Sequence, residues 1–522
     1  MLRLSTTTLP ALIRAQSSIA SLRSSIMASS ANIARLERRL ALHPDPAKKR
    51  VAVLGAGRSS TPLIRYLAEY AEKVEPITVV VADADMETAV ARAKESPALA
   101  PVELDVEDSE KLASIVGSSD VVVSMLPAGF HGRVMDAALA ARVPMVTASY
   151  ATPELRSAYQ DRAEEAGIPI IMECGVDPGL DHMSAMALID EIRNEGGNVR
   201  EFRSYTGGLV AEESSRDNPW KYKISWNPRN VVLAGQGVSK YLQAGVTKFV
   251  PYNKLFSRAK NIVFPDGTTF EAYANRDSLR YIDAYSLQDA STVLRGTLRW
   301  PGYCEAWDVF VQLGLTDDSF VMENSDRMTY AEFLGSFLPW RESDSVELLL
   351  AYQLQKPMFS DVMEKVRWLG LFSDRRVNRK GTPASILESI IKRKWRLRPG
   401  DRDLIGMLHK ISYVDSQGVA RERRSALKLL GSEDDPDETA MARTVSLPVA
   451  IMTKRLLAGE SFSPGFIIPT TPDIYRPVLD ELSRDYNIHF EEHDTVLSRG
   501  IHADHYQPIT ASSATTEIDG SL

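Results

Sequence analysis

A glycine-containing turn near the start of the chain is the first segment whose residue types and spacing could do chemistry. It follows the apolar run Arg50–Leu54 and reads Gly55-Ala-Gly-Arg-Ser-Ser60, the G-x-G-x-x-G pattern with serine in the third place. In that pattern the first glycine permits a tight turn, the second admits a pyrophosphate, and amides of the next helix bind its charge. We therefore predict a dinucleotide site; the alternative is a sheet that kept the turn without the ligand. The predicted phosphate contacts are Gly55, Gly57, Arg58, Ser59 and Ser60.

An acidic residue at the end of the next apolar run bears on which dinucleotide binds. Asp83 follows the run Ile77–Ala82, about 20 to 30 residues after the glycines, where a carboxylate accepts both ribose hydroxyls of NAD. The same carboxylate repels the 2′-phosphate of NADP, so we expect NAD rather than NADP. Asp85 competes for this role, Arg58 softens the repulsion, and a helix N-cap is the alternative for Asp83. Further cofactor contacts are predicted at the ends of the third and fourth runs: Asp105, Val106 and Leu126.

Two polar residues follow the fifth and sixth apolar runs and are candidates for catalysis. Tyr150 comes just past the fifth run, and Asp177 just past the sixth. Ligands of open α/β sheets bind beyond the carboxyl ends of the strands, so position alone makes both candidates. An ordinary turn explains Asp177 equally well, since proline and glycine follow it. Nearby, Asp181 is a good helix cap, and His182, for which the sequence shows no partner, is more typically a packing or hydrogen-bonding residue than a base.

Several later segments concentrate arginine and lysine among aromatic residues and glycines, inside an acidic protein. Guanidinium groups bind carboxylates through two parallel hydrogen bonds, so these segments suit a substrate with several carboxylates. Solvated surface cations are the alternative explanation. The segments are 205–209, 218–229, 275–278 and 295–300.

The elements that position these residues begin with six apolar runs that alternate with helical patterns. The runs are rich in Val and Ile, as are parallel strands buried on both faces. The intervening segments are long enough for crossover helices, so we predict an α/β fold with a Rossmann-type doubly wound parallel sheet. The predicted strands are 50–54, 77–82, 102–106, 120–126, 144–149 and 168–172.

The rest of the chain mixes both kinds of element, which indicates a larger α/β domain with a helical portion. The predicted elements are helices within 327–400, strands at 405–414 and 422–430, helices at 445–457 and 477–484, and an edge strand at 488–490.

Composition excludes several classes of protein. The chain has 522 residues, 44% of them hydrophobic and 25% charged, with a formal net charge of −8. That acidic balance disfavours nucleic-acid binding. The only two cysteines, Cys174 and Cys304, provide neither a disulfide framework nor a cysteine-based zinc site, and we predict no metal. We also predict that no segment spans a membrane and that the substrate is a small molecule. A homodimer is expected only because dimers are the commonest assembly of soluble oligomers.

The N-terminal region differs from the rest in composition. Residues 1–44 contain six arginines, many serines and threonines, and the single acid Glu37. This pattern is typical of an organelle transit peptide, so we expect a mitochondrial location. The alternative is a cytoplasmic protein with a disordered tail and a translation start at Met27. The C-terminal residues 511–522 are expected to be disordered as well.

The sequence closely resembles L-glutamate-forming saccharopine dehydrogenases, also called saccharopine reductases. The resemblance covers about residues 50–495, and its motifs are long and specific. The matching segments are Val53–Gly57, Asp120–Pro127, Val146–Tyr150, Glu173–Ala187, Ser204–Leu209, Asn218–Arg229, Pro251–Tyr252, Asn275–Ser278, Arg295–Arg299, Leu447–Ala450 and Gly465–Pro469.

The resemblance implies an oxidoreductase of lysine metabolism. Members oxidise saccharopine with NAD or NADP, and the resulting imine is hydrolysed to L-glutamate and 2-aminoadipate 6-semialdehyde. The three carboxylates of saccharopine agree with the cationic segments. The implied organisation is a Rossmann-type domain at 49–175, a substrate domain at 176–330 and 405–465, a helical portion at 331–404, and a segment at 466–500 that returns toward the first domain. Composition adds a transit peptide or disordered segment at 1–48 and a disordered tail at 501–522.

Carried over position by position, the resemblance implies site residues. Tyr150 and Asp177 match polar residues near the reacting amine, and Arg276 matches a binder of substrate carboxylates. Fungal members have Cys where this chain has Thr206, so a thiol is not the essential base here. They also have a basic residue near the end of the second strand, whereas the acids of this chain again favour NAD. Weaker substrate-binding expectations are Asn218, Lys223, Thr206, Thr297 and Arg299.

Two other functions remain open from the sequence. One is a related carbon–nitrogen dehydrogenase, for example one that makes carboxynorspermidine, which a substrate panel would distinguish. The other is a non-catalytic dinucleotide-binding protein that acts as a redox sensor. Such a sensor would keep Gly55 and Gly57 but would have no reason to cluster Arg276, Arg295 and Arg299.

Overall fold

The computed structural model describes residues 48–341 and 344–497. The chain divides into two compact units: Met1–Met172 with Met452–Ile467, and Glu173–Ile451 with Ile468–Leu522. The transit peptide and the C-terminal tail that the sequence predicts lie outside the described residues. Helix α15 (Ala440–Leu457) runs through the boundary between the two units along the chain.

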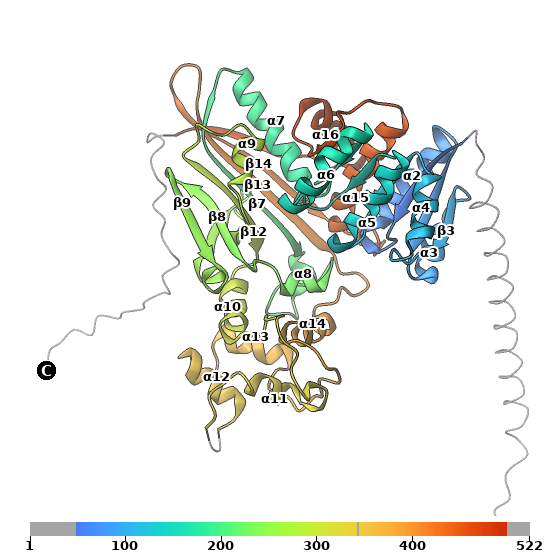
Figure 1. The fold of residues 1–522 in the computed structure, drawn as a ribbon. Coiled ribbons are helices and arrows are strands. Elements are labelled where there is room, and N and C mark those ends of the chain that lie inside the picture. Colours follow the sequence, from blue (N-terminus) through green and yellow to red (C-terminus); the bar gives the residue numbers. More distant parts are fainter. Residues whose placement is uncertain (1–47, 342–343, 498–522) are drawn as a thin grey trace, which may run out of the picture. The chain divides into compact units, whose positions relative to one another are not determined.

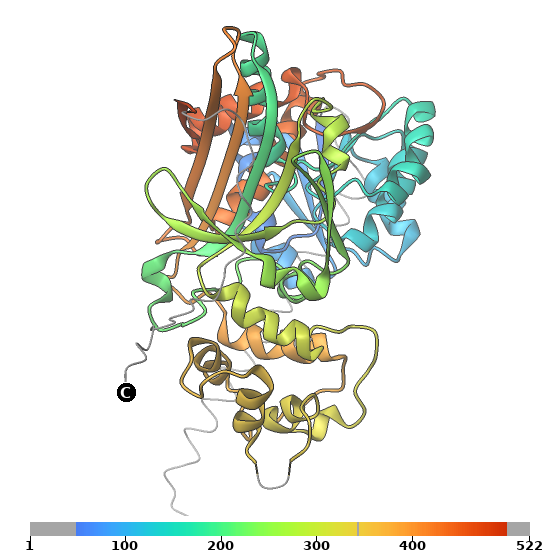
Figure 2. The ribbon, with the colours of Figure 1, turned by 90° about the vertical axis from the view of Figure 1, so that its left-hand side faces the viewer.

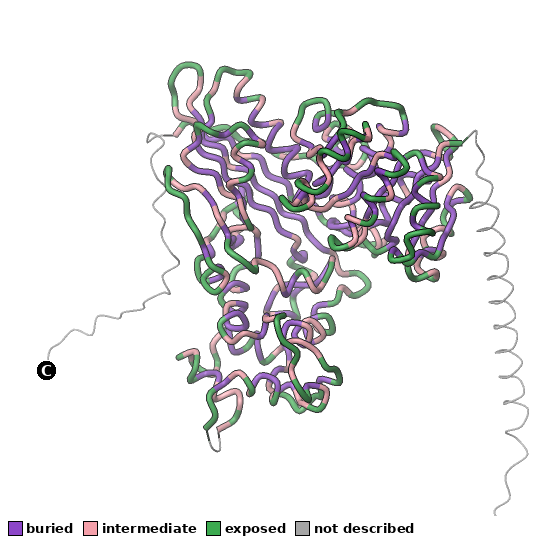
Figure 3. The backbone as a smooth tube through the Cα atoms, viewed as in Figure 1, coloured by how far each residue is buried: buried purple, intermediate pink, exposed green. Residues whose placement is uncertain are grey.

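The first unit is built on a seven-stranded sheet in the order β15-β6-β5-β4-β1-β2-β3, in which every pairing is parallel. Its central strands are fully buried, as Figure 3 shows, because helices cover both faces. The predicted Rossmann-type sheet is therefore confirmed. The strands are β1 (Lys49–Leu54), β2 (Ile77–Asp83), β3 (Leu99–Glu103), β4 (Val121–Ser124), β5 (Met145–Thr147), β6 (Pro169–Ile171) and β15 (Gly465–Ile467); the helices are α2 (Thr61–Lys73), α3 (Met86–Ala93), α4 (Ser109–Gly117), α5 (His131–Ala141) and α6 (Pro153–Ala166).

Two predicted strands are displaced along the chain. The third strand, predicted at 102–106, is β3 and contains Pro101; proline is tolerated because β3 is the edge strand of this sheet. The edge strand predicted at 488–490 is β16 (Glu491–Val496) instead. Ile488 closes the end of a helix, since its N–H donates to the carbonyl of Leu482, and Asp494 of β16 pairs with Arg421 across the strands.

The second unit is built on a nine-stranded mixed sheet, whose main path is β10-β11-β12-β7-β13-β14-β16. β7 and β12 pair in parallel, and the long strands β7, β13 and β14 run side by side in antiparallel fashion (Figure 2). The strands are β7 (Asn198–Val210), β8 (Val238–Gln243), β9 (Val246–Pro251), β10 (Lys260–Val263), β11 (Thr269–Ala274), β12 (Thr292–Arg299), β13 (Asp403–Val414), β14 (Ala420–Leu430) and β16; the accompanying helices are α7 (Leu180–Asn194), α8 (Pro228–Val232), α9 (Arg280–Ala284) and α16 (Pro472–Tyr486).

The second unit has a helical portion (Figure 1), whose helices pack into an apolar core that also includes residues of β8, β9 and β11. Trp220, Trp307 and Trp395 are almost completely buried in it, and the rings of Trp220 and Trp395 lie 5.2 Å apart in an edge-on arrangement. The helical pattern predicted for 327–400 is confirmed. The helices are α10 (Tyr303–Leu313), α11 (Tyr330–Gly335), α12 (Val346–Leu354), α13 (Asp361–Leu369) and α14 (Pro383–Lys394).

Over the described ranges, no helix combines the length and apolarity that a bilayer crossing requires. In the same ranges no cluster of three or more His, Cys, Asp or Glu side chains is arranged to hold a metal ion. Cys174 and Cys304 are buried free thiols.

Candidate functional site

The two glycines of the first turn have different structural roles. Gly55 has φ of +98°, and a Cβ placed there would lie 3.0 Å from the carbonyl oxygen of Met125. Gly57 has an ordinary φ of −62°, and a Cβ there would meet no atom within 4 Å. Gly55 is therefore required by the fold itself, whereas Gly57 leaves open space beside the backbone. That open space fits a dinucleotide pyrophosphate on the turn.

Serine in the third glycine position closes the turn with a hydrogen bond. The buried Ser60 hydroxyl donates to the carbonyl oxygen of Gly55 at 2.7 Å. A side chain is thus useful here, because it ties the end of the turn to its beginning. Arg58 and Ser59 precede it in a short 3₁₀ helix, Arg58 exposed and Ser59 partly exposed.

The Asp83 side chain, at the end of β2, is hydrogen-bonded to the same turn. One carboxylate oxygen accepts from the N–H of Ala56 at 2.8 Å, and the other accepts from the N–H of Asp85 at 3.0 Å. The helix-cap alternative for Asp83 is wrong, because Asp85 is the N-cap of α3 and accepts from the N–H of Glu87. Asp83 is partly exposed, so a negative charge stands beside the turn where a ribose would lie.

The other predicted cofactor contacts lie at strand ends of the same unit. Asp105 is exposed after β3, and its carboxylate accepts from the N–H of Glu107 at 2.9 Å. Val106 is buried, and Leu126 is partly buried just after β4. Tyr150 is partly buried just after β5.

A buried histidine that the sequence did not single out links two strands of the first unit. His131 at the start of α5 bonds through Nδ1 to the Ser124 hydroxyl at 2.9 Å and through Nε2 to the Ser149 hydroxyl at 2.6 Å. Burial lowers the pKa of His131 from 6.5 to about 4. No motif reveals this contact, because its three residues are separated along the chain by turns and a helix.

The first prediction concerns acid stability. The unfolded chain takes up a proton at His131 below pH 6.5, and the folded chain does so only near pH 4, so stability falls as the pH falls through this window. His131→Gln keeps two polar ends but does not titrate. Denaturant unfolding should show that, between pH 7 and pH 5, the wild type loses about 2 kcal/mol more than the variant. Equal losses in the two proteins would contradict this role of His131.

In the second unit, Asp177 lies in a loop closed by backbone hydrogen bonds. Gly175 N–H donates to the carbonyl of Pro178 at 2.9 Å, and Leu180 N–H donates back to Gly175 at 2.8 Å. The loop ends at Gly179, which has φ of +146° and whose Cβ would lie 2.2 Å from Gly175 backbone atoms. Only glycine fits there, so the backbone holds Asp177 at a defined place.

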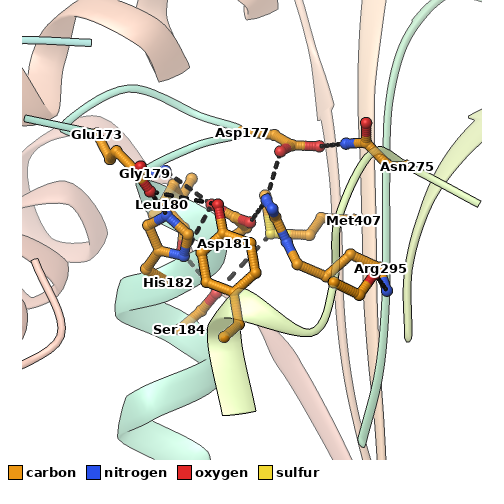
Figure 4. Close-up of polar contacts among 12 residues, drawn as sticks. Glu173, Asp177, Gly179, Leu180, Asp181, His182, Ser184, Asn275, Arg295 and Met407 are labelled. Atoms are coloured by element: carbon orange, nitrogen blue, oxygen red, sulfur yellow. Dashed lines mark hydrogen bonds and ion pairs between the residues drawn. The ribbon is translucent and has the colours of Figure 1, made fainter. Parts of the chain in front are cut away.

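The Asp177 carboxylate is held by two side chains from other elements, as Figure 4 shows. Arg295 of β12 donates from Nη2 to one oxygen at 2.5 Å, and Asn275 donates to the other at 3.4 Å. The same Arg295 nitrogen also pairs with Asp181 at the start of α7. Burial raises the pKa of Asp181, but the nearby charges of Arg295 and His182 outweigh that effect and leave it lowered. Asp181 also accepts from the N–H of Gly179 at 2.7 Å.

His182 is a buried hydrogen-bonding residue, in agreement with the expectation from sequence, and it has two partners that the sequence did not show. Its Nε2 lies 2.8 Å from a carboxylate oxygen of Glu173, and its Nδ1 bonds to the Tyr285 hydroxyl. Glu173 also pairs with Arg280 at 3.2 Å, and both His182 and Glu173 are completely buried. Burial raises the pKa of Tyr285 well above its usual value. Tyr285 lies 103 positions from His182 in the chain, so the sequence could not pair these two residues.

Two of the predicted substrate-binding residues, Asn218 and Lys223, have side chains that bond to other groups of the protein. Asn218 donates to the carbonyl of Tyr222 at 2.7 Å and accepts from the N–H of Trp220 at 3.0 Å. Lys223 is buried and pairs with Asp401 at 2.7 Å. These bonds shape the 218–223 loop, and they leave these groups little capacity for a substrate.

Arg299 is enclosed by aromatic rings. Its guanidinium lies 5.3 Å from the ring centres of Tyr222 and Tyr303, and it donates to the Tyr273 hydroxyl at 3.0 Å. It is 3% exposed, so it is held within the core rather than toward solvent.

The remaining predicted substrate residues lie in or beside the strands next to Arg295. Thr206 of β7 and Thr297 of β12 are register partners, two strand positions beyond the pair of Arg295 with Ser204. Arg276 is exposed, has φ of +48°, and follows Asn275 directly. The structure thus separates the predicted cations into an exposed Arg276, an Arg295 bound to carboxylates, and an Arg299 inside an aromatic core.

Comparison with known proteins covers both units. Residues 51–171 match the saccharopine dehydrogenase NADP binding domain, and residues 175–488 match the saccharopine dehydrogenase C-terminal domain. Saccharopine dehydrogenase (NADP(+), L-glutamate-forming) of Saccharomyces cerevisiae is 35% identical over 450 residues, which is 85% of this chain and 99% of the yeast protein. A solved apo structure of the L-Glu-forming yeast enzyme has a TM-score of 0.76 at 33% identity and covers 86% of this chain and all of that one.

Alpha-aminoadipic semialdehyde synthase, mitochondrial, of Bos taurus is 35% identical over 445 residues. That match is 84% of this chain but only 47% of the bovine protein, so the chain spans about half of that longer relative. Together the two family-model matches cover residues of both units. The chain belongs to the saccharopine dehydrogenase family.

Proposed function

We propose that the chain, an NAD(P)-binding oxidoreductase of lysine metabolism, oxidises L-saccharopine to L-glutamate and 2-aminoadipate 6-semialdehyde. The observation that carries the proposal is the match to the yeast L-glutamate-forming enzyme over 99% of its length. The glycine turn supports the cofactor half, since its open backbone beside Gly57 fits a dinucleotide. When bound, the nicotinamide ring of that dinucleotide takes the hydride from saccharopine.

Asp177 is the proposed proton acceptor. The secondary amine of saccharopine must lose its proton before hydride leaves, because a protonated nitrogen has no lone pair to form the imine. A carboxylate at the tip of a closed loop can take that proton directly or through one water. Tyr150 is the second candidate for this role. Water then adds to the imine carbon, and the carbon–nitrogen bond breaks to release L-glutamate and the semialdehyde.

Arg276 is the proposed partner of a substrate carboxylate. It is exposed, and its loop is tied to β12 by the bonds from Asn275 N–H to Arg295 O and from Arg295 N–H to the Ser278 hydroxyl. Thr206 and Thr297 are weaker candidates in the same region of the sheet. We give Asn218, Lys223 and Arg299 structural roles instead, because protein groups already hold their side chains.

NAD is the proposed cofactor in preference to NADP. The yeast relative is described as using NADP(+), and the matching first domain as NADP binding, so family likeness alone points the other way. The residues of this chain favour NAD, because Asp83, Asp85 and Asp105 place negative charge at the ends of β2 and β3. A 2′-phosphate would be repelled there.

The second prediction tests this choice. Asp83→Asn removes the charge and keeps an oxygen that can accept from Ala56 N–H. The ratio of kcat/KM with NAD to kcat/KM with NADP should fall about tenfold or more, which corresponds to at least about 1.4 kcal/mol of relieved repulsion. Asp85→Asn is the matched comparison, since it removes one charge two residues away and keeps a good N-cap. Its ratio should fall less, because it is Asp83 whose carboxylate is hydrogen-bonded to the glycine turn. A ratio unchanged in Asp83→Asn, or changed equally in both variants, would contradict the role of Asp83.

The proposed function is tested with purified protein, saccharopine, and NAD and NADP in parallel. Reduced dinucleotide should accumulate only with saccharopine, and L-glutamate should form in equal amount. Carboxynorspermidine in the same assay tests the related dehydrogenase. Absence of reduction with every substrate, together with measurable dinucleotide binding, would favour the non-catalytic sensor. We also propose a mitochondrial location, which subcellular fractionation tests.

A further inference from the structure

We propose that Arg295 is a positioning residue, which fixes the Asp177 carboxylate at the reacting centre and does not itself bind a substrate carboxylate. The inference rests on the proposed function and deepens it. Residue type and sequence position place Arg295 among the cations that suit a polyanionic substrate. Its contacts in the structure assign it to a different role.

Protein groups already contact the Nη2 atom and one face of the Arg295 guanidinium. Nη2 contacts both the Asp177 and the Asp181 carboxylates, and the guanidinium carbon lies 4.3 Å from the ring centre of Tyr281. The side chain is 5% exposed. A substrate carboxylate could reach this group only by displacing buried carboxylates, and leaving them unpaired would be costly.

The charge of this cluster also opposes a substrate carboxylate. Two carboxylates, Asp177 and Asp181, share the single guanidinium of Arg295. Asp177 is the most exposed of them, at 15% against 5% for Arg295 and 1% for Asp181. The group that a ligand meets first is therefore the anion, which attracts the ammonium form of an amine.

The backbone of Arg295 extends the same arrangement to the neighbouring loop. Its N–H donates to the Ser278 hydroxyl at 3.0 Å, and its carbonyl accepts from the N–H of Asn275 at 2.8 Å. The side chain of Asn275 meets the second oxygen of Asp177. Arg295 thus orients the proposed proton acceptor through its side chain and the loop that carries Arg276 through its backbone. Such fixed orientation is what a positioned base needs, since small misplacements lower the rate steeply.

Arg295→Met is the direct test of positioning. With Asp177 released, kcat for saccharopine oxidation should fall about 30-fold or more, while the saccharopine KM and the dinucleotide Kd change by less than about threefold. Arg295→Lys keeps the positive charge but lacks the planar guanidinium with its several N–H donors. Its kcat should therefore lie between those of Arg295→Met and the wild type. Arg203→Lys is the matched control: this buried arginine of β7 pairs with Glu201, and its variant should keep kcat within about twofold of the wild type.

A second variant keeps the test decisive if Arg295→Met does not fold. Arg295→Met combined with Asp181→Asn removes one charge of each sign, so the buried cluster keeps its net charge. It should show the same loss of kcat, and its crystal structure should show the Asp177 carboxylate displaced. Wild-type kcat with an undisplaced Asp177 would overturn the proposal. So would a strong rise in saccharopine KM at unchanged kcat, because that result marks Arg295 as a substrate binder.

The wild type assayed in parallel separates the two claims. A wild type inactive with saccharopine would contradict the proposed function alone, since the position of Asp177 in the double variant is read from its structure. An active wild type with unaffected variants would contradict the role of Arg295 alone.

Discussion

Replacing Asp177 by Asn is expected to lower kcat for saccharopine oxidation by about 10²–10⁴-fold, the range that a positioned general base contributes. Asparagine has the same shape and can still accept from Arg295, but it cannot take the proton of the amine. The saccharopine KM should change much less, because the substrate carboxylates bind elsewhere. Steady-state rates of dinucleotide reduction at saturating saccharopine measure the effect.

The control for this variant is Asp217→Asn, an exposed aspartate of the same unit that pairs with Arg398 at 2.8 Å. Its kcat should stay within about twofold of the wild type, since exposed ion pairs contribute little. If Asp177→Asn keeps wild-type kcat, the proton goes elsewhere. Tyr150→Phe then becomes the decisive variant, and loss of activity in it would move the acceptor role to Tyr150.

The sheet of the first unit could be predicted because most of its strands, and the helices between them, show their residue pattern within a short segment of the sequence. Residues 51–54 of β1 form a continuous apolar run, and the long helical segments between such runs admit only parallel crossovers. The seventh strand could not be predicted in the same way. Gly465–Ile467 has three residues, too few for any periodicity, and it pairs with β6 from almost 300 positions away in the chain.

The glycine turn was predictable for a related reason. Every atom that shapes it comes from one short segment or from the end of the next strand, so residue type and spacing carry the information. The sequence could not show that Ser60 closes the turn or that Asp85, and not Asp83, caps α3. Both outcomes depend on which of several nearby hydroxyls and carboxylates reaches a given backbone group.

The substrate side was less predictable, because residue type alone does not say what a charged group meets. Arg276, Arg295 and Arg299 look alike in sequence. In the structure one is exposed, one lies between two carboxylates, and one lies among tyrosine rings. Those partners come from β11, α7, α9 and α10 and from the loops that hold Asp177 and Tyr222, and only tertiary packing brings them together. Buried ion pairs of this kind cannot be inferred without tertiary contacts.

The glycine turn yields the other large expected effect, through a matched pair of variants. Gly57→Ala should leave thermal stability unchanged, because φ is −62° and the new Cβ meets no atom within 4 Å. It should nevertheless raise the dinucleotide Kd about 100-fold, since a methyl group would stand where the pyrophosphate approaches, at a cost of about 3 kcal/mol. Fluorescence titration with NADH and NADPH measures Kd, and a thermal melt measures stability.

Gly55→Ala should lose both properties. Its φ of +98° disfavours any side chain, and the new Cβ would lie 3.0 Å from Met125 O, so the melting temperature should fall along with affinity. Gly117→Ala, where the nearest atom would be 3.9 Å away, should change neither. If Gly57→Ala instead bound NADH as the wild type does, the pyrophosphate would not lie on this turn. The turn would then be a purely structural bend, and the proposed oxidoreductase would need a different dinucleotide site.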